Sequence, residues 1–288
     1  MTLMRTGGGP SAQLRCKTAL VVILLFLLTG CAGDPLLHAD QMARSAGLQR
    51  ETVQATPFAL AAWVRITRAD QPLHIYIEGD GRAWRNRYQP SDDPTPRKAI
   101  GLSLAVADSA PNVLYLARPC QFVPMTQNPR CQTDYWTGKR FAPEVIAAMD
   151  QAMTHYLSRT PGQPIILTGY SGGAAVAALL AARRSDVTLL RTVAGNLDHR
   201  AINRFHKVSP MPDSLNPADE VARIATIPQR HFSGAEDNIV PPFIGRDFAA
   251  AVGKCASWQL IPNIGHEGDW SQIWPQLLRQ KIQCGDKK

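Results

Sequence analysis

Ser171 lies in residues 169–173, whose sequence GYSGG has the spacing G-x-S-x-G. The apolar run 164–168 precedes this segment, and the small-residue run 174–180 follows it. A serine hydroxyl is a poor nucleophile unless the fold holds it beside a base and beside donors that stabilise an oxyanion. Glycines around a serine, placed between a strand and a helix, suit the sharp turn called a nucleophile elbow. The pattern therefore predicts a nucleophilic serine at the end of a buried strand.

A nucleophilic serine needs a base, and the base needs an orienting carboxylate. Among the seven histidines, His266 follows the last predicted strand within a glycine-containing loop, IGHEG. Loops at the carboxyl ends of strands are where an α/β sheet gathers its chemistry, so His266 is the predicted base. Asp237, in the loop after the strand that ends at Ser233, is the favoured acid. Asp198, which follows the preceding strand, remains the alternative acid.

Extended and helical patterns alternate from about residue 57 onward, which predicts βαβ units. We expect an α/β fold, with a mostly parallel central sheet, helices on both faces and a short cap insertion over residues 198–227. The segments 58–67 and 73–78 are expected to form a strand pair. The remaining predicted strands are 112–118, 164–168, 188–194, 229–233 and 258–261, and the predicted helices are 98–107, 143–158, 174–180, 245–252 and 269–282.

Three segments together resemble the α/β-hydrolase fold superfamily, from about residue 57 to the C-terminus. They are the elbow around Ser171, the acid loop with the pattern Gly-x-x-Asp237-x-x-Val-Pro, and the Gly-His266 base loop. The chain order Ser171, Asp237, His266 is also the order of that superfamily. The resemblance implies a serine hydrolase that works through an acyl-enzyme on a small acyl-ester substrate, with no metal and no organic cofactor.

The resemblance also implies an oxyanion site. One donor would be the backbone N–H of Gly172, and the second would come from the loop after the strand 73–78. Many members have His-Gly there, whereas this chain has Glu78-Gly79. We assign the second N–H to Asp80, with Gly81 as the alternative. An acidic side chain at this point must point away or be paired, and Arg82 or Arg85 could pair with it.

The N-terminal segment predicts export. Residues 1–33 contain no Asp or Glu, and basic residues precede an apolar stretch over 19–28 that is too short to span a bilayer. The following Leu-Thr-Gly-Cys31 looks like a bacterial lipobox, so residues 1–30 are predicted as a signal peptide and Cys31 as a lipidated anchor. An ordinary signal peptide with an incidental cysteine is the alternative. By resemblance to lipoprotein sorting rules, the protein is expected in the cell envelope, on the outer membrane facing the periplasm, with residues 31–56 as a tether and 57–288 as the domain.

The other cysteines fit an oxidising compartment. Cys120, Cys131, Cys255 and Cys284 remain beyond the leader and Cys31, and four cysteines allow three connectivities. Sequence proximity favours Cys120–Cys131 and Cys255–Cys284, and four unpaired buried thiols are the alternative.

The charge is uninformative about partners. The formal net charge of +8 falls to +5 when Arg5, Arg15 and Lys17 leave with the signal peptide, and no dense basic run suggests nucleic-acid binding.

Carboxylester hydrolysis is the leading hypothesis, followed by thioester or lipid-acyl substrates and then by peptides. The alternatives are a non-catalytic envelope lipoprotein on a hydrolase scaffold and a perhydrolase-like enzyme.

Overall fold

The structure, a computed structural model, describes residues 1–3 and 33–285. The segment Pro35–Lys288 forms one compact unit. The apolar core of the predicted signal peptide and the predicted lipidation site Cys31 lie outside the described residues. Within the part of the chain that is described, no helix is both long enough and apolar enough to span a bilayer.

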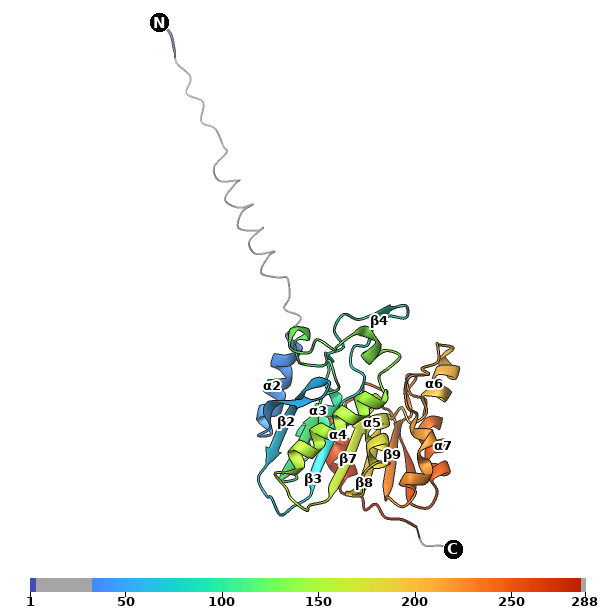
Figure 1. Cartoon of the computed structure of the whole chain (residues 1–288). Coiled ribbons are helices and arrows are strands. Elements are labelled where there is room, and N and C mark those ends of the chain that lie inside the picture. Colours follow the sequence, from blue (N-terminus) through green and yellow to red (C-terminus); the bar gives the residue numbers. More distant parts are fainter. Residues whose placement is uncertain (4–32, 286–288) are drawn as a thin grey trace. The chain divides into compact units, whose positions relative to one another are not determined.

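An eight-stranded sheet forms the centre of the unit, in the order β1-β2-β6-β3-β7-β8-β9-β10 (Figure 1). Neighbouring strands from β6 to β10 are parallel, and β2 runs antiparallel to both of its neighbours, β1 and β6. The strands are β1 (Gln49–Ala55), β2 (Phe58–Ile66), β3 (Leu73–Ile77), β6 (Asn112–Leu116), β7 (Ile165–Tyr170), β8 (Val187–Val193), β9 (Gln229–Gly234) and β10 (Ala256–Ile261). This architecture confirms the predicted fold class.

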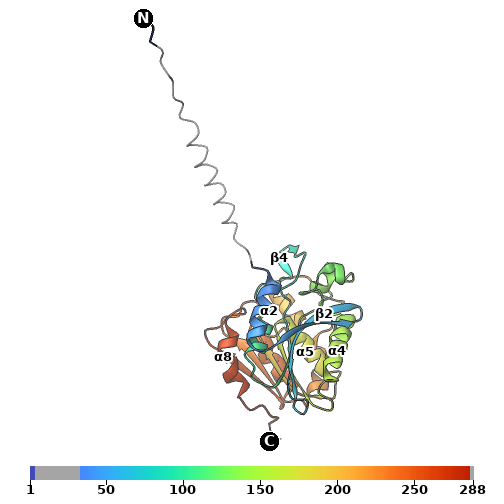
Figure 2. The ribbon, with the colours of Figure 1, turned by 90° about the vertical axis from the view of Figure 1, so that its left-hand side faces the viewer.

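Helices cover both faces of the sheet, and each face has its own apolar cluster. Strand residues alternate between the two: in β6, Leu114 and Leu116 join one cluster and Val113 and Tyr115 the other. Figure 2 shows α2 and α8 on one side of the sheet and α4 on the other. The helices are α2 (Pro35–Ser45), α3 (Ile100–Val106), α4 (Pro143–Leu157), α5 (Gly172–Ala181), α6 (His199–His206), α7 (Phe243–Val252) and α8 (Trp270–Leu278).

The predicted pairing of the segments 58–67 and 73–78 is wrong. Strand β6 lies between β2 and β3, and it pairs antiparallel with β2 and parallel with β3. The strands β2 and β3 are neighbours in the sequence but not in the sheet. The chain passes from β3 through α3 and returns as β6, which occupies the position between them. The alternation of apolar and polar side chains predicts that a segment is a strand. It does not predict which strand lies beside it, because tertiary packing decides the pairing.

Residues 35–55 are not a tether, as the sequence suggested, but part of the fold. Ala39 and Ala43 of α2 are buried, and β1 pairs with β2 along its whole length, from Gln49–Val64 to Ala55–Phe58. The segment looks polar and alanine-rich because the fully buried side chains of α2 are alanines and β1 is an edge strand. The domain therefore begins at Pro35 instead of residue 57.

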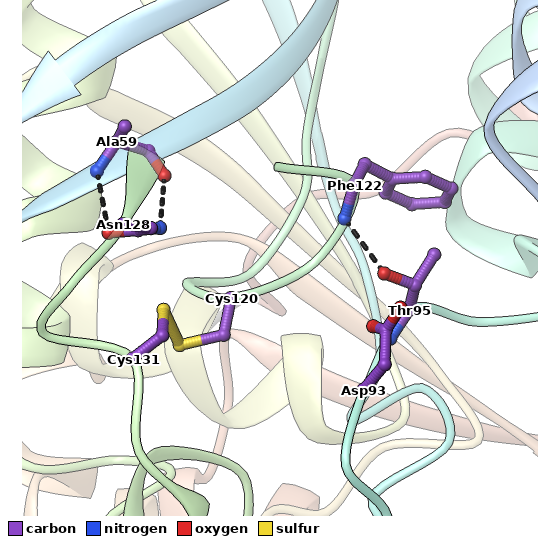
Figure 3. The surroundings of a disulfide bond; sticks show 7 residues. All are labelled: Ala59, Asp93, Thr95, Cys120, Phe122, Asn128 and Cys131. Carbon is purple, nitrogen blue, oxygen red and sulfur yellow. Dashed lines mark hydrogen bonds between the residues drawn. A yellow bond between two sulfur atoms is a disulfide. The ribbon is translucent and has the colours of Figure 1, made fainter. Parts of the chain in front are cut away.

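Long connections after β3 and β6 meet at the carboxyl edge of the sheet. The first contains a separate hairpin, β4 (Trp84–Asn86) and β5 (Gln89–Pro90), which the sequence did not predict. The second carries the disulfide Cys120–Cys131, and Cys255 pairs with Cys284, so both bridges follow the pairing that proximity favoured. Figure 3 shows how the disulfide loop is held: the Asn128 side chain bonds the backbone N–H and C=O of Ala59, and the Phe122 N–H donates to Thr95 Oγ1.

Candidate active site

Ser171 lies at the turn between β7 and α5, with φ 51° and ψ −120°. This conformation is rare for a residue with a side chain, and such strain persists only where the surroundings enforce it. The turn is tight enough that glycine is required on both sides. A Cβ on Gly169 would lie 2.3 Å from the Gly173 carbonyl oxygen, and one on Gly173 would lie 2.2 Å from the Ile77 carbonyl oxygen. The predicted elbow therefore has the close strand–helix packing that its glycines suggested.

Ser171, His266 and Asp237 form a hydrogen-bonded chain. Ser171 Oγ lies 2.9 Å from His266 Nε2, and His266 Nδ1 lies 2.8 Å from Asp237 Oδ2. All three residues are buried, so the chain is shielded from bulk water. A neutral imidazole with its proton on Nδ1 satisfies both contacts, because Nδ1–H then donates to the carboxylate and Nε2 accepts from the hydroxyl.

The surrounding loops fix the imidazole and the carboxylate. Asp237 Oδ1 accepts the backbone N–H groups of Ile239 and Val240, which leaves Oδ2 for His266. The His266 carbonyl oxygen accepts from the Tyr170 hydroxyl and from the Trp270 indole, each at 3.1 Å. Both groups are thus held in place by partners outside the three-residue chain.

Asp198 has a different environment from Asp237. It is the N-cap of α6, and its carboxylate accepts from the backbone N–H groups of Arg200 and Ala201 and from the Asn216 amide. A short acidic side chain at a helix start satisfies backbone donors that have no intrahelical partner. The structure therefore brings Asp237 and not Asp198 to His266.

The two predicted oxyanion donors lie next to each other. Gly172 is the first residue of α5, where a backbone N–H has no intrahelical acceptor. The Asp80 N–H likewise has no acceptor among the described residues. The Asp80 carboxylate packs directly against Gly172, because a Cβ added to Gly172 would lie 2.0 Å from Asp80 Oδ1. Glycine at position 172 thus makes room for the Asp80 carboxylate.

The Asp80 carboxylate is paired, but not with Arg82 or Arg85 as the sequence suggested. Its oxygens lie 2.7 Å from Arg140 Nη1 and 3.3 Å from Arg118 Nη1. Burial alone would raise the pKa of Asp80, but the charges of Arg140 and Arg118 outweigh it and hold that pKa below its usual value. The carboxylate beside the elbow is therefore ionised, and the two arginines compensate its negative charge. Arg85 instead pairs with Asp92.

Glu78 occupies the place where the superfamily often has histidine, and it holds the predicted oxyanion loop, which is the segment after β3 that carries Asp80. Its carboxylate, 1% exposed, accepts the N–H of Gly79 at 2.8 Å, of Gly101 at 3.1 Å and of Leu102 at 3.3 Å. The Tyr115 hydroxyl donates to it at 2.9 Å. Burial raises the pKa of Glu78, and these donors oppose the rise only in part. Ala99, the N-cap of α3, offers no side-chain acceptor, and Glu78, which directly follows β3, supplies one.

Arg118 and Arg140 were not singled out from the sequence, and Glu78 was noted only as a departure from the His-Gly of many superfamily members. A signal existed for Glu78, because a charged residue that ends a buried strand must find buried partners. No such signal existed for the arginines. They come from the loops after β6 and before α4, and only the folded chain brings them to Asp80.

The predicted cap insertion, residues 198–227, contains α6 and two short 3₁₀ helices, Pro217–Asp219 and Val221–Ile224. It contacts the loop that carries Arg140: the Leu215 N–H donates to the Phe141 carbonyl, and the Phe141 N–H donates to Ser214 Oγ. The insertion therefore borders the arginine-paired side of the site.

No protein-family model matches the chain, and no curated protein sequence matches it. Solved structures do match. A bacterial membrane phospholipase A superposes with a TM-score of 0.58 at 14% identity, covering 93% of this chain and 98% of that one. Est1E from Butyrivibrio proteoclasticus gives 0.56 at 12% identity over 80% of this chain and 97% of its own. XC6422 from Xanthomonas campestris, an α/β serine hydrolase described as having no lid, gives 0.53 at 14% over 81% and 94%.

At these identities the likeness establishes the fold. Together with the strand order and the elbow between β7 and α5, it shows that the chain has the α/β-hydrolase fold.

Proposed function

We propose that the protein is a serine hydrolase that cleaves carboxylesters or related acyl compounds. The observation that carries the proposal is the hydrogen-bonded chain from Ser171 Oγ through His266 to Asp237, with heavy-atom distances of 2.9 Å and 2.8 Å, at a strained elbow. A nucleophile beside a base that is itself oriented by a carboxylate is the arrangement that activates a serine hydroxyl.

In the proposed reaction His266 Nε2 takes the proton of Ser171 as Oγ attacks the acyl carbonyl. Asp237 keeps the imidazole oriented and stabilises its positive charge. The N–H groups of Gly172 and Asp80 stabilise the oxyanion, and such a donor contributes about 3 to 4 kcal/mol in comparable sites. His266 then protonates the leaving group. Water, activated by the same imidazole, hydrolyses the acyl-enzyme and regenerates Ser171.

The names of the structural neighbours include an esterase, a membrane phospholipase A and an acylaminoacyl peptidase, and they support acyl chemistry as the class of reaction.

We further propose that the protein is exported and anchored in the bacterial envelope by lipid on Cys31, facing the periplasm. Two disulfides in one domain suit an oxidising compartment and support the export.

A fluorophosphonate probe tests the proposed nucleophile. The probe is expected to label the wild-type protein at Ser171, because it reacts with activated serine hydroxyls and mimics an acyl donor. Peptide mapping by mass spectrometry locates the adduct, and Ser171→Ala is the control. Absence of labelling on a folded wild-type protein would favour a non-catalytic role for the scaffold.

Glu78→Gln tests the support of the oxyanion loop. One carboxamide oxygen cannot satisfy the four donors that now point at the carboxylate, and its NH₂ group faces backbone N–H groups. Unsatisfied buried donors cost about 1 to 3 kcal/mol each, so we expect a loss of about 2 to 3 kcal/mol in the free energy of unfolding. We also expect kcat for an acyl ester to fall more than KM changes, because the loop acts on the transition state.

Chemical denaturation and steady-state kinetics measure the two effects. Glu236→Gln is the matched control, since Glu236 is an exposed glutamate beside Asp237. Equal behaviour of the two variants would contradict the positioning role of Glu78.

A further inference from the structure

The β4–β5 hairpin and the residues before it carry aromatic and basic side chains together in solvent. Trp84 is 43% exposed and Tyr88 is 86% exposed, and they alternate with Arg82, Arg85 and Arg87, which are all exposed. We call residues 82–90 the hairpin segment. Large exposed aromatic side chains beside arginines are unusual on a surface that meets only water. They suit a lipid–water interface, where the ring lies among the headgroups and the guanidinium meets the phosphates.

The base of the hairpin segment is fixed to the domain while its tip is free. Ala83 is buried, the Ser91 N–H donates to the Ala83 carbonyl, and the Trp136 indole donates to the Ser91 carbonyl at 3.0 Å. The chain that follows is held by the hydrogen bond from the Phe122 N–H to Thr95, next to the Cys120–Cys131 disulfide (Figure 3). The base thus fixes the direction in which the tip points, so the hairpin segment would lose little conformational entropy on binding a partner surface.

The charge of this region is positive. Residues 82–98 contain five basic side chains against Asp92 and Asp93, a net charge of +3. Arg85 is offset by its pairing with Asp92, whereas Arg82 and Arg87 form no salt bridge within the described residues. An anionic surface complements this arrangement, and each nearby arginine adds to its attraction.

The position of the hairpin segment also favours a membrane. Figures 1 and 2 both place β4 at the same end of the domain as the start of α2. Three residues separate the proposed anchor Cys31 from Pro35, so the four Cα–Cα steps between them span at most about 14 Å. A lipidated Cys31 would therefore hold this end of the domain close to the bilayer. The segment also directly follows the loop that carries Asp80, so the edge of the sheet that carries Ser171 would lie near the lipid.

We propose that the hairpin segment docks on an anionic phospholipid surface, with Trp84 and Tyr88 at headgroup depth and Arg82 and Arg87 on the lipid phosphates. The docking holds the active-site edge of the sheet toward the membrane that anchors the chain. It does not depend on the chemistry of Ser171.

Vesicle sedimentation of residues 33–288, which include the whole compact unit and lack the anchor, tests this docking. The protein is expected to bind vesicles of phosphatidylcholine mixed with phosphatidylglycerol, and to bind phosphatidylcholine alone much less. Arg82→Gln and Arg87→Gln should each weaken the partition coefficient about fivefold. Trp84→Ala with Tyr88→Ala should weaken it about tenfold. Added salt should weaken the binding as well.

Matched variants control for exposed charge and exposed aromatic area in general. Arg183→Gln and Lys254→Gln remove exposed cations from the turns before β8 and β10, at the opposite edge of the sheet, and Phe205→Ala removes a ring that is 54% exposed. These variants should bind like the wild type. Equal losses in control and hairpin variants would overturn the proposal, as would no vesicle binding, equal binding to neutral lipid, or binding to duplex DNA in place of vesicles.

Two further measurements separate this proposal from the hydrolase proposal. Ser171→Ala should bind vesicles as the wild type does. The hairpin variants should keep their fluorophosphonate labelling, which shows that their active site remains intact. A protein that binds vesicles but is not labelled would retain the docking and lose the proposed chemistry.

Discussion

Replacing Ser171 by alanine is expected to lower kcat for hydrolysis of a short acyl ester by about 10⁴- to 10⁶-fold, with KM nearly unchanged. The hydroxyl is the group that forms the acyl-enzyme, and no other hydroxyl is hydrogen-bonded to His266 Nε2 among the described residues. The alanine methyl group fits where Oγ is removed, so substrate binding and the elbow persist. Residual rate would come from binding and from the oxyanion donors alone.

Steady-state kinetics on p-nitrophenyl esters of increasing chain length measures this loss and ranks the substrates in one experiment. Thermal unfolding of the variant should match the wild type, which separates lost chemistry from lost fold. Equal activity of the two proteins on every ester would contradict the proposed nucleophile.

Asp237→Asn is expected to lower kcat about 10⁴-fold. The asparagine keeps the size of the side chain, but its amide NH₂ would face His266 Nδ1 at 2.8 Å and favour the tautomer with the proton on Nε2. In that tautomer the imidazole donates to Ser171 and cannot accept its proton. The loss should therefore appear in kcat at every pH at which the wild type is active.

Asp198→Asn is the matched control for the same substitution at the alternative acid. Its side chain caps α6, and asparagine is nearly as good an N-cap as aspartate, so activity should change little. A loss in Asp198→Asn as large as that in Asp237→Asn would contradict the assignment of the acid.

The elbow could be found from the sequence because its cause is local. Gly169, Ser171 and Gly173 lie within five consecutive residues, and Gly169 is required by backbone atoms of residues 173 and 174. The alternation of β and α segments is local in the same sense, since side-chain period reports which faces an element buries. These two features were enough to predict the fold class and the position of the nucleophile.

The pairing of strands was not local, and there the sequence misled. Strand β6 enters between β2 and β3, and the polar segment 35–55 joins the domain through α2 and β1. An edge strand buries one row of side chains and α2 buries alanines, so neither shows a strong apolar period. Composition alone therefore made a folded segment look like a tether.

The sequence by itself pointed to the candidate reacting groups: a serine on a glycine elbow, a histidine in a terminal loop, and two candidate acids. Folding brought one acid to His266 and made the other a helix cap. It also placed Arg118 and Arg140 on Asp80 and Glu78 on the start of α3. The physical reason is the separation along the sequence. Backbone turns and side-chain periods depend on residues a few positions apart, whereas a buried charge is stabilised by groups that are distant in the sequence and come close only in the folded chain.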